Sequence, residues 1–354
     1  MNSEYEILGL MSGTSLDGLD IALCTFTETG NGWNYLISFA ETVPYPEVWK
    51  SRLVKSHQLC SEDLIKLDRD YGNYIAGVVN KFLKKNCLKP QIISSHGHTV
   101  FHAPSQGYTL QLGHGPNISA GTGLPVIFDF RSTDIALGGQ GAPLVPIGDK
   151  LLFPEYDACL NLGGFANISF DLESLRRAFD ICPVNIILNH FAESNGLPYD
   201  KDGILGRQGE INKILFDKLE NLQYYKASLP KSLSREWLEE VFIHEIESVN
   251  CPEQDKIHTV YLHIASQIAK TLEQYSVKKV LVTGGGAYNI LLTEIIRKNF
   301  HSELILPDNK TIEFKEALIF AFLGLLRSLN RTNCLASVTG ASKDSSCGVI
   351  HYNS

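Results

Sequence analysis

The first forty residues of the chain alternate apolar and polar positions with the period of a β-strand. Residues 5–10 form an apolar run, apolar side chains return at alternate positions over residues 19–26, and a third strand-like run covers residues 35–42. Successive side chains of a strand point to opposite faces, so this pattern predicts three strands. Between the first two strands, residues 12–18 read SGTSLDG, which predicts a tight hairpin turn of small, hydroxylated residues.

The period then changes to that of an α-helix. From Ser61, a predicted N-cap, apolar residues recur at three- and four-residue spacing as far as Phe82, and Pro90 ends the segment. Further strand-like runs follow at residues 92–93, 108–112 and 124–128. This order predicts a βββαβ lobe with additions.

The opening pattern returns in the second half of the chain. Residues 158–162 are strand-like, Gly163 and Gly164 form a turn, and residues 166–170 are strand-like again. A repeated strand–turn–strand unit indicates an internally duplicated, two-lobed protein. A glycine-rich loop marks the expected boundary between the lobes. We expect an N-terminal lobe at residues 1–131 and a C-terminal lobe with helical insertions at residues 132–354. The C-terminal tail is free to pack back on the first lobe.

The rest of the second lobe is expected to be mainly helical. Residues 204–275 are charged and helix-like, whereas residues 279–283 form a compact buried-strand candidate that runs into Gly284, Gly285 and Gly286. Residues 315–329 are apolar nearly all round, which fits a helix buried between layers. The chain is therefore predicted to have an α/β fold.

Composition narrows the class of protein. The 354 residues are 44% hydrophobic and carry a net charge of −8 without a cluster of Lys and Arg, so nucleic acid and anionic membranes are not expected partners. The eight cysteines are scattered, without a C-x-x-C pair, which indicates reduced thiols. No signal peptide is recognisable, and the most apolar window, residues 317–326, is far shorter than the roughly 20 residues that span a bilayer. We expect a cytoplasmic protein.

The three glycine turns are candidate phosphate sites. The hairpin turn at residues 12–18 can direct backbone N–H groups and hydroxyls at an anion, and Asp17 can hold a hydrated cation beside it; an ordinary hairpin is the alternative. The turn at residues 284–286 lies between a strand and a helix, a layout that binds nucleotides, but it lacks the G-x-G-x-x-G spacing. The alternative is a helix entry that needs glycine so that the strand and the helix can pack closely. Two hairpin turns and one strand–glycine–helix element together suit a nucleotide held in a cleft between two lobes.

Several side chains are candidates for the chemistry. His96, His98, His102 and His114 could bind a metal, but no carboxylate accompanies them, so contacts in loops or with a substrate are favoured. Asp180 could serve as a general base if it faces a bound water, with a capping or surface role as the alternative. Glu316 could be a helix first-turn acid and nothing more.

Ordered motifs along nearly the whole chain resemble those of the anhydro-N-acetylmuramic acid kinase family. After GLMSGTSLDGLD come SHGHTVFH, LQLGHGPNIS and DFRSTDIALGGQGAPLVP, followed by NLGGFANIS, PYDKDG, TGGGAYN, KEALIFAFLG and SVTGA. The resemblance implies a two-lobed actin-like ATPase (ribonuclease H-like) fold with duplicated lobes, use of ATP and Mg²⁺, and a homodimer. It also implies conversion of 1,6-anhydro-N-acetylmuramic acid to N-acetylmuramic acid 6-phosphate during cell-wall recycling.

The resemblance also assigns roles to residues. Asp180 matches the catalytic aspartate of the family's F-D-T-G-P-x-N motif, and Asp17 is expected near Mg²⁺. Residues His96, Arg131, Asp134 and Glu316 are candidates for sugar contact or site support. The expected nucleotide-binding residues are Gly13, Thr14, Ser15, Leu16, Asp17, Gly18, Leu19, Asp20, Gly163, Gly164, Asn167, Gly284, Gly285 and Gly286.

The chain departs from the family pattern at several positions. Ile181 and Cys182 stand in FDICPVN where the family usually has Thr and Gly, Asn189 stands where an aspartate often follows, and His98 replaces a glutamine. A kinase for another anhydro sugar, such as levoglucosan, is therefore an alternative. A third hypothesis is an ATP-driven binding protein of the actin or Hsp70 type, whose ATP turnover would not depend on sugar.

Overall fold

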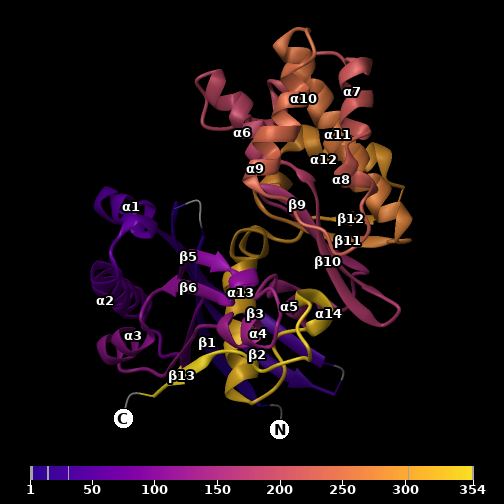
Figure 1. The fold of residues 1–354 in the computed structure, drawn as a ribbon. Coiled ribbons are helices and arrows are strands. Elements are labelled where there is room, and N and C mark those ends of the chain that lie inside the picture. Colours follow the sequence, from indigo (N-terminus) through magenta and orange to yellow (C-terminus); the bar gives the residue numbers. More distant parts are fainter. Residues whose placement is uncertain (1–2, 14–15, 31, 302, 353–354) are drawn as a thin grey trace. The chain divides into compact units, whose positions relative to one another are not determined.

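The computed structural model describes residues 3–13, 16–30, 32–301 and 303–352, and the structural statements below refer to these residues. The chain forms two compact units, shown as a ribbon in Figure 1. Unit 1 comprises Met1–Pro154 and Phe314–Ser354, and unit 2 comprises Glu155–Glu313.

This division corrects the expected boundary near residue 131. Residues 132–154 belong to unit 1, and so does the C-terminal segment, as expected for a tail that packs back. The physical reason is a packing contact between two helices far apart in the sequence: a Cβ at Gly148 would stand 2.7 Å from the Ile319 side chain. The chain therefore leaves unit 1 only after the helix that carries Gly148.

Unit 1 is built on a six-stranded mixed sheet of order β13-β7-β4-β1-β2-β3, with β5 and β6 as a separate pair. Its strands are β1 Glu4–Ser12, β2 Gly18–Thr29, β3 Gly32–Pro44, β4 Ile92–Ser95, β5 His98–Ala103, β6 Tyr108–Leu112, β7 Val126–Phe128 and β13 Val349–His351. Its helices are α1 Glu47–Val54, α2 Ser61–Asn86, α3 Gly115–Thr122, α4 Ser132–Ala136, α5 Val145–Leu152, α13 Asn309–Ser328, which begins in unit 2, and α14 Ala336–Thr339.

Helices pack on both faces of the unit 1 sheet. One face contacts α2 through an apolar cluster that includes Leu10 and Tyr71. On the other face α13 crosses β1 so closely that a Cβ at Gly9 would stand 2.0 Å from the carbonyl oxygen of Ala317. The buried, nearly all-round apolar helix predicted for residues 315–329 is thus confirmed as the larger part of α13.

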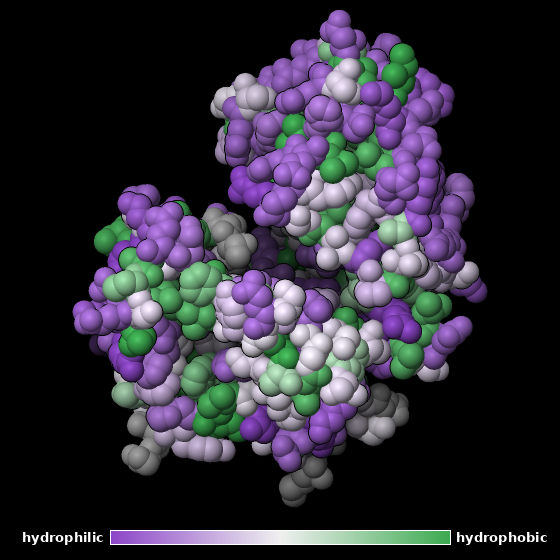
Figure 2. Space-filling model, viewed as in Figure 1, coloured by the Kyte–Doolittle hydropathy of each residue, from purple (hydrophilic) through white to green (hydrophobic). Residues whose placement is uncertain are grey.

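Unit 2 is built on a five-stranded sheet of order β10-β9-β8-β11-β12. Its strands are β8 Ala158–Leu162, β9 Phe165–Leu172, β10 Leu175–Pro183, β11 Lys279–Thr283 and β12 Glu303–Ile305. Its helices are α6 Asn185–Ser194, α7 Lys213–Glu220, α8 Gln223–Lys226, α9 Arg235–Trp237, α10 His244–Glu247, α11 Glu253–Gln274 and α12 Ile290–Asn299, with a π-helical segment at Leu238–Ile243. In Figure 2 the surface over α7 and α10 is mainly hydrophilic, as expected for helices with one buried stripe.

The two sheets share one topology. In each, three consecutive antiparallel strands are followed by a strand that pairs parallel with the first and by a further parallel strand, which gives β3-β2-β1-β4-β7 in unit 1 and β10-β9-β8-β11-β12 in unit 2. The duplication predicted from the repeated hairpin is confirmed. The fold is α/β with two ribonuclease H-like sheets, the architecture of actin-like ATPases.

The close approach of α13 to β1 generates a stability prediction. Gly9→Ala is expected to lower the free energy of unfolding by about 3 kcal/mol, because the added methyl group meets a backbone oxygen that cannot move without shifting the helix. Denaturant titration of both proteins measures this difference. As a control, Gly77→Ala on α2, where no atom lies within 4 Å of the added methyl, is expected to stabilise by about 0.5–1 kcal/mol. Equal effects of the two substitutions would contradict the packing argument.

Candidate active site

The strand register of unit 2 aligns four polar side chains in one row. Asp180 of β10 lies opposite Asn167 of β9, Asn167 lies opposite Asn161 of β8, and Asn161 lies opposite Thr283 of β11. Residues that face each other across paired strands project from the same face of a sheet. The row therefore brings together two predicted site residues, Asp180 and Asn167, and adds Asn161 and Thr283, whose only signal in the sequence is their place beside a glycine turn.

Asn161 lies beneath two of the predicted glycine turns. A Cβ at Gly284 would stand 2.4 Å from its Oδ1 atom, and a Cβ at Gly163 would stand 3.2 Å from its Nδ2 atom. Gly284 also has a φ of +84°, which side chains rarely adopt. The two turns consequently lie next to each other at one end of the sheet, as a shared nucleotide site requires.

Hydrogen bonds from the β10–α6 connection hold the Gly163–Gly164 turn in place. The backbone N–H groups of Val184 and Asn185 donate to the carbonyl oxygens of Gly164 and Gly163, at 2.8 and 3.1 Å. The side-chain amide of Asn185 donates to the Leu162 carbonyl at 2.9 Å. The Gly163–Gly164 turn is thus fixed from the strand that carries Asp180.

The Gly284–Gly286 turn differs from the expected direct entry into a helix. A 3-10 turn, Gly285–Tyr288, follows Gly284, and the α-helix α12 begins only at Ile290. The Asn289 side chain accepts the N–H of Leu292, so α12 has its own cap. Backbone groups of the glycine turn, rather than the α12 N-terminus, are therefore the groups available to a ligand.

Asp180 lies on the edge strand β10, at a bulge between Asp180 and Cys182. Its Oδ2 atom accepts the backbone N–H of Leu233 at 2.9 Å, and its backbone carbonyl accepts the hydroxyl of Tyr224. Burial raises the pKa of its carboxyl, which the Leu233 amide counteracts by binding the charged form. A partly buried carboxylate with a raised pKa has the properties of a general base.

The unit 1 hairpin turn was predicted to bind phosphate from Gly13 to Asp20. Thr14 and Ser15 lie outside the described residues. Leu16 has a φ of +59°, in the left-handed region that side chains rarely adopt. The Asp17 side chain is exposed and none of the described residues donates to its carboxylate, which fits a ligand to hydrated Mg²⁺.

The remaining positions of this turn make contacts within unit 1. Gly18 begins β2, where a Cβ would stand 2.6 Å from the Val43 carbonyl oxygen, and Leu19 is buried in the core. Asp20 accepts the Thr42 hydroxyl at 2.6 Å. Asp20 lies one residue after the last paired residue of the β1–β2 hairpin, as Asn167 does in the β8–β9 hairpin. On the next strand, Thr42 pairs with Asp20 as Asp180 pairs with Asn167.

His96 orients Arg131 in unit 1. Its Nδ1 atom donates to the Gly97 carbonyl at 2.8 Å, which leaves Nε2 to accept from Nη2 of Arg131 at 2.8 Å. Burial, aided by the Arg131 charge, lowers the pKa of His96 to about 3, so the ring stays neutral. The Arg131 guanidinium also donates to the Gly141 carbonyl at 2.6 Å.

Glu316 and Asp134 contrast in exposure. The Glu316 side chain is exposed at its surface, yet desolvation by the protein packed around its carboxyl raises the carboxyl pKa, against the opposing effect of the Lys315 and Arg131 cations. Asp134 is fully buried: it accepts the Gly141 N–H and the Thr339 hydroxyl, both at 2.7 Å. Of these two candidates for sugar contact or site support, only Glu316 has an exposed side chain, while Asp134 supports the loop that holds Arg131.

The other histidines have separate surroundings. His98 lies 3.3 Å from the Ser12 hydroxyl, His102 lies 3.2 Å from the Thr109 hydroxyl, and His114 lies 2.6 Å from Oδ1 of Asn117. Among the described residues, no three His, Cys, Asp or Glu side chains gather as a metal cluster would require.

Within residues 3–13, 16–30, 32–301 and 303–352, no helix is both long and apolar enough to span a membrane.

Comparisons with solved structures return distant likenesses. An activator of 2-hydroxyisocaproyl-CoA dehydratase from Clostridium difficile with bound ADPNP is 14% identical, with a TM-score of 0.40 over 93% of this chain and 97% of that one. A ROK family glucokinase from Streptomyces griseus, in complex with glucose and AMPPNP, is 13% identical, with a TM-score of 0.37 over 89% and 97% of the chains. These values are too low to carry a functional conclusion.

Comparisons of sequence are decisive. The family model for anhydro-N-acetylmuramic acid kinase matches residues 5–353. The proteins of that name from Haemophilus influenzae and Sulfurimonas denitrificans are 35% and 32% identical; each alignment covers 99% of this chain and 98% or 100% of the relative. The chain belongs to the anhydro-N-acetylmuramic acid kinase family.

Proposed function

We propose that the protein is an ATP-dependent kinase that hydrolyses the 1,6-anhydro bond of 1,6-anhydro-N-acetylmuramic acid and phosphorylates O6, giving N-acetylmuramic acid 6-phosphate. The observation that carries this proposal is the placement of Asp180, a carboxylate of raised pKa, in one row with Asn167 and beside two interlocked glycine turns. The family membership supplies the reaction that such a base would serve.

Asp180 acts as the general base in this reaction. Its carboxylate takes a proton from a water molecule whose oxygen attacks C1 of the sugar, and the bond between C1 and O6 breaks. The released O6 attacks the γ-phosphorus of ATP, and ADP leaves. A carboxylate of raised pKa suits the step because its ionised form is a stronger base than that of an ordinary aspartate.

The glycine turns and Asp17 are proposed to bind the nucleotide. Backbone N–H groups of residues 163–164 and 284–286 are close enough to each other to serve one ligand, and the absence of side chains there admits phosphates to the backbone. The Gly13–Asp20 turn would bind phosphate in unit 1, and Asp17 would hold Mg²⁺ through its waters. When bound, Mg²⁺ neutralises charge on the transferring phosphoryl group.

Arg131 and Glu316 are proposed to contact the sugar. The Arg131 side chain has donors beyond the two hydrogen bonds described above, and the Glu316 carboxyl is exposed with a raised pKa. His96 and Asp134 would act through Arg131 and its loop, since both are buried and engaged by protein groups.

We also propose that the protein is a cytoplasmic homodimer of peptidoglycan recycling. None of the eight cysteines, all of which lie among the described residues, forms a disulfide, which is consistent with a reducing compartment. The resemblance to the family supports the dimer, which light scattering after size-exclusion chromatography measures directly.

The catalytic assay is the first test. With Mg²⁺ and ATP, the anhydro sugar is expected to yield the 6-phosphate by mass spectrometry, with one ¹⁸O from labelled water at C1 and none in the phosphate. Asp180→Asn is expected to lower kcat by about 10²- to 10⁴-fold, because the amide cannot take the proton. Asp171→Asn, on the same hairpin but exposed, is the matched control and is expected to keep wild-type turnover. ATP hydrolysis that ignores the sugar would point instead to an ATP-driven binding protein.

A substrate panel tests the alternative raised by the FDICPVN motif. Ile181 and Cys182 are both buried against the unit 2 core, so their effect on sugar choice would be indirect, through the bulge that carries Asp180. We expect 1,6-anhydro-N-acetylmuramic acid to have the highest kcat/KM and levoglucosan, which lacks the lactyl and N-acetyl groups, to be at least about 100-fold poorer. The reverse order would assign the protein to the other sugar.

The acid limb of the pH profile provides a further test. Burial raises the pKa of Asp180, and a base works only when deprotonated, so activity is lost as pH falls through this raised pKa. The apparent pKa of the acid limb of kcat/KM is therefore expected above the value of about 4 for an ordinary aspartate. An acid limb at or below that value would argue against Asp180 as the base.

A further inference from the structure

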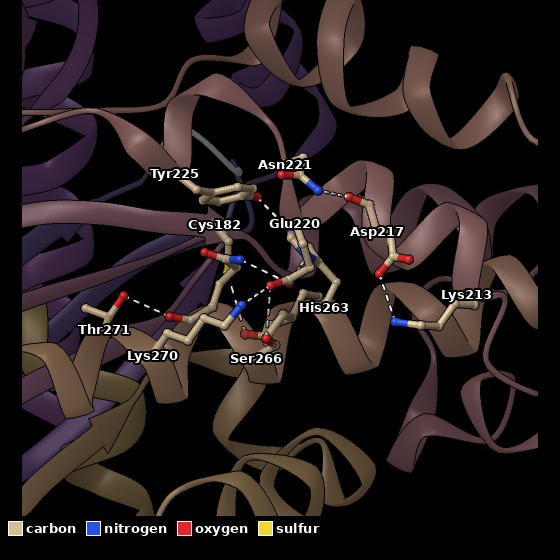
Figure 3. Close-up of polar contacts among 12 residues, drawn as sticks. Cys182, Lys213, Asp217, Glu220, Asn221, Tyr225, His263, Ser266, Lys270 and Thr271 are labelled. Carbon is tan, nitrogen blue, oxygen red and sulfur yellow. Dashed lines mark hydrogen bonds and ion pairs between the residues drawn. The ribbon is translucent and has the colours of Figure 1, made fainter.

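A buried network of ionisable side chains links three helices in unit 2. Glu220 is the last residue of α7. Its carboxylate accepts hydrogen bonds from Nδ1 of His263 at 2.7 Å and from Nε2 of Gln267 at 3.0 Å, and it forms an ion pair with the Lys270 ammonium. Tyr225 of α8 lies 2.9 Å from the other ring nitrogen of His263. Figure 3 shows Glu220 at the centre of these contacts, with His263 between Glu220 and Tyr225.

The protonation states of the network follow from its geometry. Burial alone would raise the pKa of Glu220, but hydrogen bonds from His263 and Lys270 hold it at about 2, so the carboxylate is ionised. An ionised carboxylate accepts only, so Nδ1 of His263 carries the proton. Because burial lowers the pKa of His263 and keeps the ring neutral, Nε2 accepts the Tyr225 hydroxyl.

The next residues of the chain reach from this network to Asp180. Tyr224, adjacent to Tyr225, donates its hydroxyl to the Asp180 carbonyl. Seven residues later, the Lys231 ammonium lies over the Tyr224 ring, 4.8 Å from its centroid, and the Leu233 amide donates to Oδ2 of Asp180. Residues 221–233 therefore contact both the backbone and the carboxylate of the proposed base.

We infer that residues 221–233, which we call the arm, position the Asp180 carboxylate for proton transfer, with Leu233 as the positioning residue. The inference rests on the proposed function. By occupying Oδ2, the Leu233 N–H fixes the rotation of the carboxylate, and Oδ1, to which no described residue donates, is left to take the proton of the attacking water. The Glu220–His263–Tyr225 network anchors the start of the arm on α11.

The other ionisable groups near Asp180 do not replace this contact. Tyr224 and Cys182 couple electrostatically to Asp180, and burial raises the pKa of both, so both are neutral in the pH range of catalysis. Lys231 has its pKa lowered by burial and couples to Cys182. The Leu233 amide is the contact that favours the charged form of Asp180 directly.

Two substitutions at one residue separate the amide from the side chain. Leu233→Pro removes the N–H, whereas Leu233→Ala keeps it. Leu233→Pro is expected to lower kcat by about 10- to 100-fold, leave KM for ATP within about twofold, and move the acid limb of kcat/KM to higher pH. Leu233→Ala keeps the N–H, so it is expected to lose less kcat than Leu233→Pro and to keep the wild-type acid limb. Equal losses in both variants, or an unshifted acid limb in Leu233→Pro, would overturn the inference.

A second variant and a measurement without turnover complete the test. Tyr224→Phe keeps the ring and removes the hydroxyl, so it is expected to lower kcat by about 3- to 10-fold without unfolding the arm. Titration of Asp180 by NMR, with ¹³C-labelled aspartate and Asp180→Asn for assignment, reports on the arm even if the sugar is not phosphorylated. A pKa that rises in Leu233→Pro but not in Leu233→Ala supports the arm; an unchanged pKa in both rejects it, whatever the fate of the proposed function.

Discussion

The packing of one side chain between two backbone turns holds the candidate site of unit 2 together. Asn161 projects from β8 beneath both Gly163 and Gly284, and either turn would collide with it or crowd it if the glycine carried a Cβ. Its strand partners place Asn167 and Asp180 in the same row. The distance between the proposed base and the proposed nucleotide turns is thereby set by the rigid sheet rather than by flexible loops.

Much of this arrangement could be predicted from sequence, because it depends on local patterns. The strand period around residues 12–18 and 163–164 indicated two similar hairpins, and the duplication follows from them. The domain boundary could not be predicted in the same way. It depends on the contact of Gly148 with Ile319, and a contact between residues so far apart leaves no periodic signal.

The surroundings of Asp180 show the same limit. The sequence singles out Asp180 itself, but it predicts residues 221–233 only as part of a charged, helix-like stretch, and only the fold brings the Leu233 amide to the carboxylate. A backbone N–H is present at nearly every residue, so a contact of this kind has no signature in residue type. Likewise Asp134 and His96 occur in motifs beside Arg131, and the motif alone does not distinguish a ligand contact from a buried support.

The matched register of the two hairpins shows where the two similar sheets differ in charge. In unit 1 the equivalent row carries its carboxylate, Asp20, on β2, the middle strand of the three antiparallel strands. Thr42, whose hydroxyl donates to Asp20, lies on the edge strand β3. In unit 2 the middle strand carries the neutral Asn167 and the outer strand carries the acid Asp180. The edge position leaves Asp180 open to contacts from outside its sheet, such as those from Tyr224 and Leu233. Two halves of one topology thus differ in which strand carries the acid, and only the acid on an edge strand can be oriented by a segment that is not part of the sheet.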